Sequence, residues 1–269
     1  MTIENFGLVS ASTLYTYITA PTVNNTKGAY TELKAATDNS FEGIVIHTAY
    51  CTAPRNYLID IAIGAAGSEK VIIPNLSLAT AGTYEYRMTQ THFFPIRVPK
   101  GSRISARYQA NAYASTDLGL NGYGIIARGL DGHFALADNV VDMGTQLSYS
   151  GGVTLPGIDS SAGWGAWAEI YSATPRQFHA LVPAFDQKLD NTRSDGITTI
   201  QVGIGPAGSE QAIGQTLRWI HSATDSMIET SGPIIYANIP QGTRIAARAY
   251  YSNTGLSADK NIGALIYGI

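Results

Sequence analysis

The chain has 269 residues and a formal charge of −3 at pH 7, and 45% of its residues are hydrophobic. Charged residues make up 14% of the chain, which is below the roughly one quarter typical of globular proteins. The slightly acidic balance excludes an electrostatic basis for nucleic-acid binding. The one cysteine, Cys51, excludes an intrachain disulfide framework and a cysteine-rich zinc site.

No targeting or membrane-spanning segment is predicted. The first ten residues lack the basic stretch and the continuous apolar run of a signal peptide. No run of about 18 apolar residues occurs anywhere in the chain. We therefore expect a protein that is made in a cytoplasm and does not enter a membrane.

The first predicted elements are short. Tyr30–Ala36 could form a turn of helix, although helical periodicity is otherwise scarce. Tyr57–Ile63 alternates its apolar residues around Asp60, which predicts a β-strand. The small residues of Gly64–Ser68 follow at once and predict a turn that ends this strand.

A second turn and strand are predicted further along. Pro99–Gly101 has turn chemistry, because proline fixes φ at one corner and glycine accepts a positive φ at another. In the strand that follows, Arg103 and Arg107 lie on one face, while Ile104 and Tyr108 lie on the other.

Both motifs occur twice at one fixed offset of 141 residues. Ile59–Glu69 reads IDIAIGAAGSE, and Ile200–Glu210 reads IQVGIGPAGSE. Val98–Arg107 reads VPKGSRISAR, and Ile239–Arg248 reads IPQGTRIAAR. Two separate motifs with the same offset indicate that one unit has been duplicated. Between the second pair of motifs, Thr216–Ser222 is another candidate turn of helix.

Weaker matches set the limits of the duplicated unit. Gly28–Glu32 matches Gly165–Glu169, and Tyr123–Ile125 matches Tyr267–Ile269 at the end of the chain. A unit this long indicates a tandem domain pair rather than a solenoid, whose repeats run to about 20–50 residues. We therefore predict a first repeat over residues 1–125, a connection over residues 126–143 and a second repeat over residues 144–269.

The fold class follows from the many short strands and the frequent Gly, Pro and Asn turns. This pattern is typical of an all-β sandwich or jelly roll. We predict an all-β protein with two tandem jelly-roll-like β-sandwich domains that arose from an internal duplication. The order in which the strands connect cannot be read from the pattern.

Catalytic and metal-binding motifs are absent from the sequence. The histidines share no metal-ligand or catalytic spacing, and none recurs at an equivalent repeat position: His47, His92, His133, His179 and His221. Two groups of aspartates lack the alternate-residue spacing of a Ca²⁺ loop: Asp131, Asp138 and Asp142, and Asp186, Asp190 and Asp195. We predict no catalytic residue, cofactor or metal site, and hence no enzyme.

The duplicated charges are candidates for a structural role. They occupy equivalent turns and strand faces in the two repeats: Glu69, Arg103 and Arg107, and Glu210, Arg244 and Arg248. Our hypothesis is that each glutamate pairs with an arginine of its own repeat and ties two loops at one end of the sandwich. The alternative is that all six are solvated, in which case an exposed pair contributes little.

Aromatic residues offer a second candidate role. Trp164, Trp167 and Trp219 mark the second repeat. If exposed, they could stack on sugar rings or lie in a subunit interface, where tryptophan is enriched. The alternative is that they pack in the strands and the core, as aromatic residues commonly do.

The duplicated motifs resemble those of virion structural proteins of tailed bacteriophages. Ile63–Glu69 with Pro99–Arg107 carries the resemblance in the first repeat, and Ile204–Glu210 with Pro240–Arg248 carries it in the second. The resemblance implies a β-sandwich or jelly-roll subunit that is used many times in a particle. It implies no catalytic residues, and it leaves open whether the position is capsid or tail.

From these observations we predict a non-enzymatic capsid decoration (cement) protein that binds and stabilises the assembled shell. Its expected partners are the major capsid protein or other virion proteins and further copies of itself, but neither nucleic acid nor membrane. It would be assembled into virions in the host cytoplasm. The alternatives are a tail-associated protein that binds host glycans and, less favoured, a glycan-cleaving enzyme.

Overall fold

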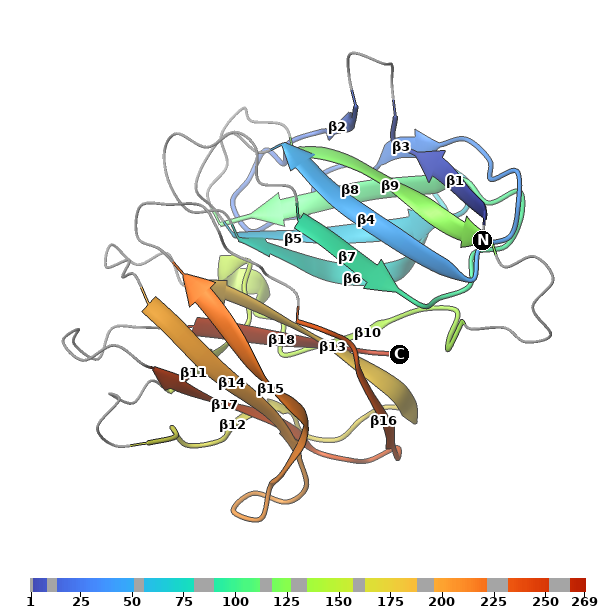
Figure 1. Ribbon diagram of the computed structural model, residues 1–269. Helices are drawn as coiled ribbons and strands as arrows, with labels where there is room; N and C mark the ends of the chain where they lie inside the picture. Colours follow the sequence, from blue (N-terminus) through green and yellow to red (C-terminus); the bar gives the residue numbers. More distant parts are fainter. Residues whose placement is uncertain are drawn as a thin grey trace.

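The protein is all-β in the computed structural model. The structure describes residues 2–8, 14–50, 56–79, 90–111, 118–126, 135–156, 163–187, 196–221, 232–251 and 262–269. The described strands form four antiparallel sheets, which pair into two β-sandwiches (Figure 1). This confirms the predicted fold class at the level of β-sandwiches.

The first sandwich is built from sheets 1A and 1B. Sheet 1A contains β1 (Thr2–Phe6), β2 (Thr16–Ile18), β4 (Gly43–Tyr50), β7 (Gln90–Phe94) and β9 (Leu118–Ile126). Sheet 1B contains β3 (Thr31–Lys34), β5 (Asn56–Ile63), β6 (Lys70–Ala79) and β8 (Ile104–Ala110).

The second sandwich is built from sheets 2A and 2B. Sheet 2A contains β10 (Val141–Met143), β11 (Val153–Leu155), β13 (Phe178–Gln187), β16 (Ile235–Ile239) and β18 (Ile262–Gly268). Sheet 2B contains β12 (Ala168–Tyr171), β14 (Gly196–Ile204), β15 (Gln211–His221) and β17 (Ile245–Tyr251). A short 3₁₀ helix, η1 (Leu147–Tyr149), lies between β10 and β11.

The two sandwiches have the same strand order. Sheet 1A runs β1-β9-β4-β7 and sheet 2A runs β10-β18-β13-β16, while sheet 1B runs β3-β8-β5-β6 and sheet 2B runs β12-β17-β14-β15. In both, the chain passes repeatedly from one sheet to the other, as it does in a jelly roll. That the halves arose by duplication stays a prediction from the sequence. The domain limits also stay a prediction, although β10 lies within the predicted connection.

The sequence patterns explain the strands nearest the duplicated motifs. The predicted strands are present as β5 and β14, and as β8 and β17 after the Pro-x-Gly turns. In β8 the apolar face with Ile104 and Tyr108 is buried in the core, as alternation requires. Gly64 and Gly101 have φ values of 113° and 80°, which favour glycine at these corners.

Two predicted helical turns are wrong. Tyr30–Ala36 contains strand β3, which pairs with β8 through Thr31 and Ala106. Thr216–Ser222 falls in β15 up to His221, and Ser222 lies outside the described residues. Both segments have neighbours in a sheet, and that pairing decides their conformation because the propensity of a few residues is weak.

The repeated Tyr-Gly-Ile motif has a packing reason. The ring of Phe41 lies where a Cβ on Gly124 would stand, and Phe178 lies in the same way against Gly268. In each sandwich a fully buried phenylalanine therefore fills the space that the glycine leaves beside the central strand. This explains why glycine stands at the same position of both repeats.

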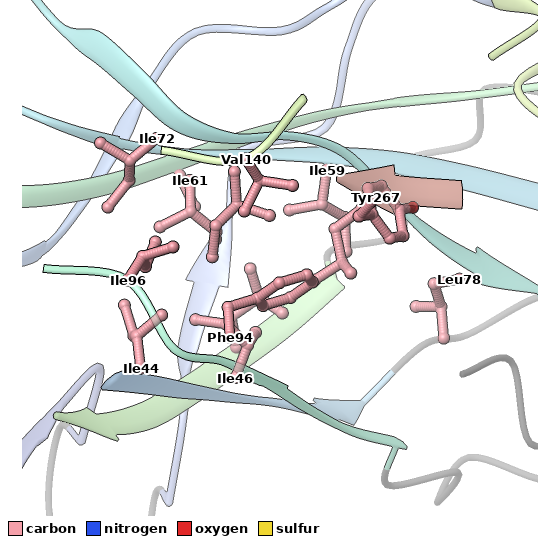
Figure 2. Close-up of a cluster of buried hydrophobic side chains, with 14 of the residues drawn as sticks. Ile44, Ile46, Ile59, Ile61, Ile72, Leu78, Phe94, Ile96, Val140 and Tyr267 are labelled. Carbon is pink, nitrogen blue, oxygen red and sulfur yellow. The ribbon is translucent and has the colours of Figure 1, made fainter. Parts of the chain in front are cut away.

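The two sandwiches share a hydrophobic core (Figure 1). Side chains on one face of β13 and β18, with that of Ile269 just after β18, join the core of the first sandwich: Ala180, Val182, Ala184, Leu265, Tyr267 and Ile269. Figure 2 shows Tyr267 and Val140 beside Phe94, Ile59 and Ile61 of the first sandwich. The rings of Tyr267 and Phe94 meet edge to face, with their centroids 5.7 Å apart. The two halves therefore form one packed unit.

Tyr267 also satisfies the free edge of β6. The backbone N–H of Ser77 donates to the Tyr267 hydroxyl at 2.7 Å, and that hydroxyl donates to the carbonyl of Asn75 at 2.8 Å. Burial raises the pKa of Tyr267, so the hydroxyl keeps its proton for this second bond. The ring of Tyr267 thus fills space in the core. Its hydroxyl hydrogen-bonds to two backbone groups of the edge strand β6 that would otherwise be buried without partners.

The Tyr267→Phe substitution tests this joint role. It keeps the ring but leaves the N–H of Ser77 buried and unpaired, so we expect it to lower the free energy of unfolding by about 1–3 kcal/mol. The control is Tyr236→Phe, at a side chain that is 70% exposed, where a change of less than about 0.5 kcal/mol is expected. Denaturant unfolding measures both. Equal values for the two variants would show that the Tyr267 hydroxyl contributes nothing.

Candidate functional site

Each sandwich presents the same cluster of charges beside its Gly-x-x-Gly turn. In the first, Arg103 lies between two carboxylates: its Nε donates to Glu32 at 2.7 Å and its Nη1 to Glu69 at 3.2 Å. Nη1 also lies 3.3 Å from the carbonyl of Gly64, and the N–H of Gly67 donates to Glu69 at 2.9 Å. The arginine thus connects strand β3 to the turn after β5.

The second sandwich repeats this arrangement atom for atom. Arg244 donates from Nε to Glu169 at 2.7 Å and from Nη1 to Glu210 at 2.8 Å. Its Nη1 also lies 3.3 Å from the carbonyl of Gly205, and the N–H of Gly208 donates to Glu210 at 2.9 Å. We call these two groups the turn clusters: Glu32, Glu69 and Arg103, and Glu169, Glu210 and Arg244.

The inner carboxylate of each turn cluster is held ionised. The backbone N–H of Glu69 and the Arg103 guanidinium lower the pKa of the Glu69 carboxyl, and burial opposes them. For Glu210 burial is the largest influence and raises the pKa, but backbone N–H groups and Arg244 together outweigh it and the pKa is lowered. Both side chains are charged at neutral pH, when the ion pairs are complete.

The turn clusters hold two exposed turns in one shape. Residues 65–68 after β5 are all exposed, as are the equivalent residues 206–209 after β14. Beside them lie the exposed Pro-x-Gly turns, in which Gly101 and Gly242 have φ values of 80° and 83°. The protein therefore presents the same local surface twice, on two halves that share a core.

The structure places the second arginine of each strand in a different environment. Arg107 does not contact Glu69; its Nε donates to Asp60 at 2.9 Å, and its guanidinium lies 4.5 Å from the ring centroid of Tyr30. Lys27 donates to the other Asp60 oxygen at 2.8 Å. Burial lowers the pKa of Lys27 to about 8, although Asp60 acts in the opposite direction.

The equivalent arginine of the second sandwich has no charged partner among the described residues. Arg248 donates from Nε and Nη2 to Oε1 of Gln201 at 2.9 and 2.7 Å. Its guanidinium lies 4.9 Å from the ring centroid of Trp164 and 4.4 Å from that of Trp167. The Trp164 ring in turn lies 6.0 Å from Tyr250. These half-buried side chains lie on the outer face of sheet 2B. We call Trp164, Trp167, Tyr250 and Arg248 the aromatic ladder.

Sequence reasoning missed the partners that complete these groups. Glu32 and Glu169 stand in the matching segments Gly28–Glu32 and Gly165–Glu169, so their equivalence was visible, but their contact with an arginine 71 or 75 residues away was not. Asp60 was read only as the polar residue of an alternating strand. The third tryptophan, Trp219, is in β15, and its side chain lies outside the described residues.

The remaining candidate residues that the structure describes do not form one cluster. Of the histidines, His47 hydrogen-bonds to Thr91, and His92 is fully buried, with its pKa lowered to about 4 chiefly by burial. Asp142 accepts from Asn75 and Thr145, and Asp186 accepts from the N–H of Gly152. Three predicted aspartates and one histidine lie outside the described residues: Asp131, Asp190, Asp195 and His133.

The described residues contain neither a metal-binding cluster nor a membrane-spanning helix. No group of three or more His, Cys, Asp or Glu residues that could hold a metal ion occurs among the described residues. No helix within the described ranges is long and apolar enough to cross a membrane.

Comparisons with known proteins give distant structural neighbours. No protein-family model and no curated protein matches the sequence. The fold is similar to PNGF-II, with 7% identity and a TM-score of 0.44 over 99% of this chain and 65% of that one. It is also similar to peptide:N-glycanase F (PNGase F), with 9% identity and a TM-score of 0.46 over 100% of this chain and 96% of that one. The chain thus spans 65% of the length of PNGF-II.

A viral structure is a more distant neighbour. A chain of infectious bursal disease virus, Gx strain, is 12% identical with a TM-score of 0.29, over 96% of this chain and 60% of that one. Likeness at this level carries no argument about this chain.

The neighbours correct one expectation from the sequence. The absence of a recognisable catalytic motif led to the prediction that the chain is not an enzyme. That prediction is contradicted by the two glycanase neighbours.

A double-mutant cycle on Glu69 and Arg103 tests the turn cluster, with Glu210 and Arg244 as the matched second case. We expect a favourable coupling at pH 7 in both pairs, because each arginine joins a strand to a turn. Because the folded-state pKa of each carboxyl lies below 4.5, the coupling is present above that pH and is lost as the pH falls through the lowered pKa.

The control cycle pairs Glu69 with Arg107, which contacts Asp60 instead. It should show no coupling at any pH. A coupling between Glu69 and Arg107 as large as that between Glu69 and Arg103 would contradict the arrangement described above.

Proposed function

We propose that the chain is a structural protein of a tailed-bacteriophage virion, which binds the assembled capsid as a decoration protein and stabilises the shell. One observation carries the proposal: the protein presents the same exposed turn surface twice, each copy held by an equivalent turn cluster. Two equivalent surfaces suit two equivalent partners, and a shell of repeated subunits offers such partners side by side. The motifs that resemble virion proteins are those that form these surfaces.

The stabilisation would follow from mass action. A protein that binds the assembled shell better than free subunits shifts the equilibrium towards the shell. When the first turn surface is bound, the second meets its site at a high effective concentration, because the shared core holds the two sandwiches together. Two modest contacts then hold neighbouring subunits firmly.

The low charge of the protein agrees with this role. With 14% charged residues, much of the surface can be buried against a neighbour without the cost of removing charges from water. The exposed turns themselves consist of small residues, Ala65–Ser68 and Pro206–Ser209, which permit close approach of another backbone.

Substitutions at Ala66 and Ala207 test the bivalent contact. Both residues are exposed in their turns, so arginine there adds bulk without disturbing the core. We expect Ala66→Arg or Ala207→Arg alone to weaken binding to purified capsids at least tenfold, and both together to abolish it in co-sedimentation. Val23→Arg, at an exposed site on another part of the surface, should bind normally.

The proposal fails if the double variant binds capsids like the unmodified protein, or if the unmodified protein does not bind them. Virions that lack the protein should release their genome at a lower temperature. Virions that are equally heat-stable but fail to adsorb to the host would favour a tail-associated role.

The aromatic ladder favours a second candidate function, the recognition of host glycans. Arg248 holds the rings of Trp164 and Trp167 in place, and aromatic rings held rigidly bind a partner at low entropic cost. On a glycan array we expect a signal that Trp164→Ala abolishes. Tyr30→Ala, at the equivalent position to Trp167 in the first sandwich, should leave it unchanged. An array without any signal would remove this candidate.

A further inference from the structure

The two sandwiches meet where one face of sheet 2A packs on the edge strand β6 of sheet 1B. The face belongs to sheet 2A, where Tyr267 stands on β18 and pairs with Val182 of β13 and Asp142 of β10. The edge belongs to β6, where the backbone N–H of Ser77 donates to the Tyr267 hydroxyl. Because the strand order is the same in both halves, each of these two surfaces has an equivalent elsewhere in the chain.

The equivalent of the face lies on sheet 1A. Tyr123 stands on β9 and pairs with Val45 of β4 and Asn5 of β1, the same positions as the partners of Tyr267. Its ring is half-buried and lies 5.6 Å from the His47 ring. Among the described residues the Tyr123 hydroxyl has no hydrogen-bond partner. On the same face Ile3 is 52% exposed.

The equivalent of the edge is β15 of sheet 2B. Ser77 pairs with Leu58 across sheet 1B, and Arg218 pairs with Thr199 in the same way across sheet 2B. The two edges differ in what covers them. Leu76, Ser77 and Leu78 of β6 are buried, whereas β15 is exposed at Gln211, Ala212, Gly214, Gln215, Thr216 and Arg218. In Figure 1 β6 lies on the side of the first sandwich that faces the second.

The chemistry of the two surfaces suits a separable contact. Sheet 1A carries His47 and Asn121 where sheet 2A carries Ala184 and Leu265, so its face is more polar than the permanent interface. In the second sandwich the side between β15 and β16 is already filled, because the Ile235 side chain of β16 lies against Gly214 of β15. A tyrosine that docks there would cap the edge of β15 rather than enter the core.

We propose that copies of this chain associate head to tail, with the Tyr123 face of one copy docked on the β15 edge of the next. The Tyr123 hydroxyl accepts the backbone N–H of Arg218, as Tyr267 accepts that of Ser77 within the chain. The two surfaces differ from each other, so the contact is heterologous and produces a ring or an open chain rather than a two-fold dimer. This association does not depend on the proposed role in the virion.

Cysteine cross-linking tests the register of the contact. In a Cys51→Ser background that keeps Tyr123 and Arg218, cysteines are placed at Ile3, on the Tyr123 face, and at Thr216, two residues before Arg218. The Ile3→Cys and Thr216→Cys variants are treated with a bismaleimide, separately and then as a mixture. We expect a cross-linked dimer from the mixture and none from either variant alone. Val23→Cys, mixed with each, should give no product. A melting temperature close to that of the background shows that each variant is folded.

Sedimentation velocity supplies the second measurement. The unmodified protein should form larger species as its concentration rises, and Tyr123→Ala or Arg218→Pro, which removes the N–H donor at the edge, should remain monomeric. Three results would overturn the proposal: a monomer at all concentrations, cross-linking of Ile3→Cys with itself, which indicates a two-fold contact, or unchanged association of Tyr123→Ala and Arg218→Pro.

Discussion

The packing of Tyr267 between β6 and β7 is the contact on which the arrangement of the two sandwiches depends. A β-sandwich is open on the two sides where the edge strands of its sheets lie. In the first sandwich, one of these sides lies between β6 and β7, and without a cover its apolar side chains and the backbone groups of β6 would be exposed. The ring of Tyr267 fills that side of the first sandwich against Phe94, and its hydroxyl pairs the edge of β6. The second sandwich thereby becomes part of the core of the first, and the relative position of the two turn clusters follows.

The two halves share a backbone arrangement but differ in chemistry at equivalent positions. Around Arg103 and Arg244 the partners are the same, and the geometry differs by tenths of an ångström. Around Arg107 the partner is a buried carboxylate, which is satisfied by Lys27 as well. Around Arg248 the partner is the amide of Gln201, and two indole rings supply the rest. The turn clusters therefore have the same geometry in both sandwiches, whereas the side chains around Arg107 and Arg248 differ in their chemistry.

The packed face of sheet 2A and the equivalent face of sheet 1A also differ in composition. Where sheet 2A meets the first sandwich its residues are small or apolar, because they are permanently removed from water. The equivalent face of sheet 1A has Val45 and Tyr123 but also the polar residues His47 and Asn121, which hydrogen-bond within the chain to Thr91 and to the carbonyl of Leu14. Composition at equivalent positions thus distinguishes an internal interface from one that forms between molecules.

The sequence by itself determined the all-β class, the turns at Gly64 and Pro99, and the strands that flank them, because alternation and turn chemistry are local properties of the chain. It also marked the charges that recur, because the duplicated motifs carry Glu69, Arg103 and Arg107 at fixed positions, but it left open whether and with which arginine the glutamate pairs. It misjudged Tyr30–Ala36, where pairing with β8 overrides a weak local preference.

Only the tertiary structure decided which arginine each glutamate meets, how Asp60 is satisfied, and that Tyr267 joins the two halves. Those contacts link residues 33 to 192 positions apart. Such partners are set by strand order and sheet packing, which a local pattern does not contain.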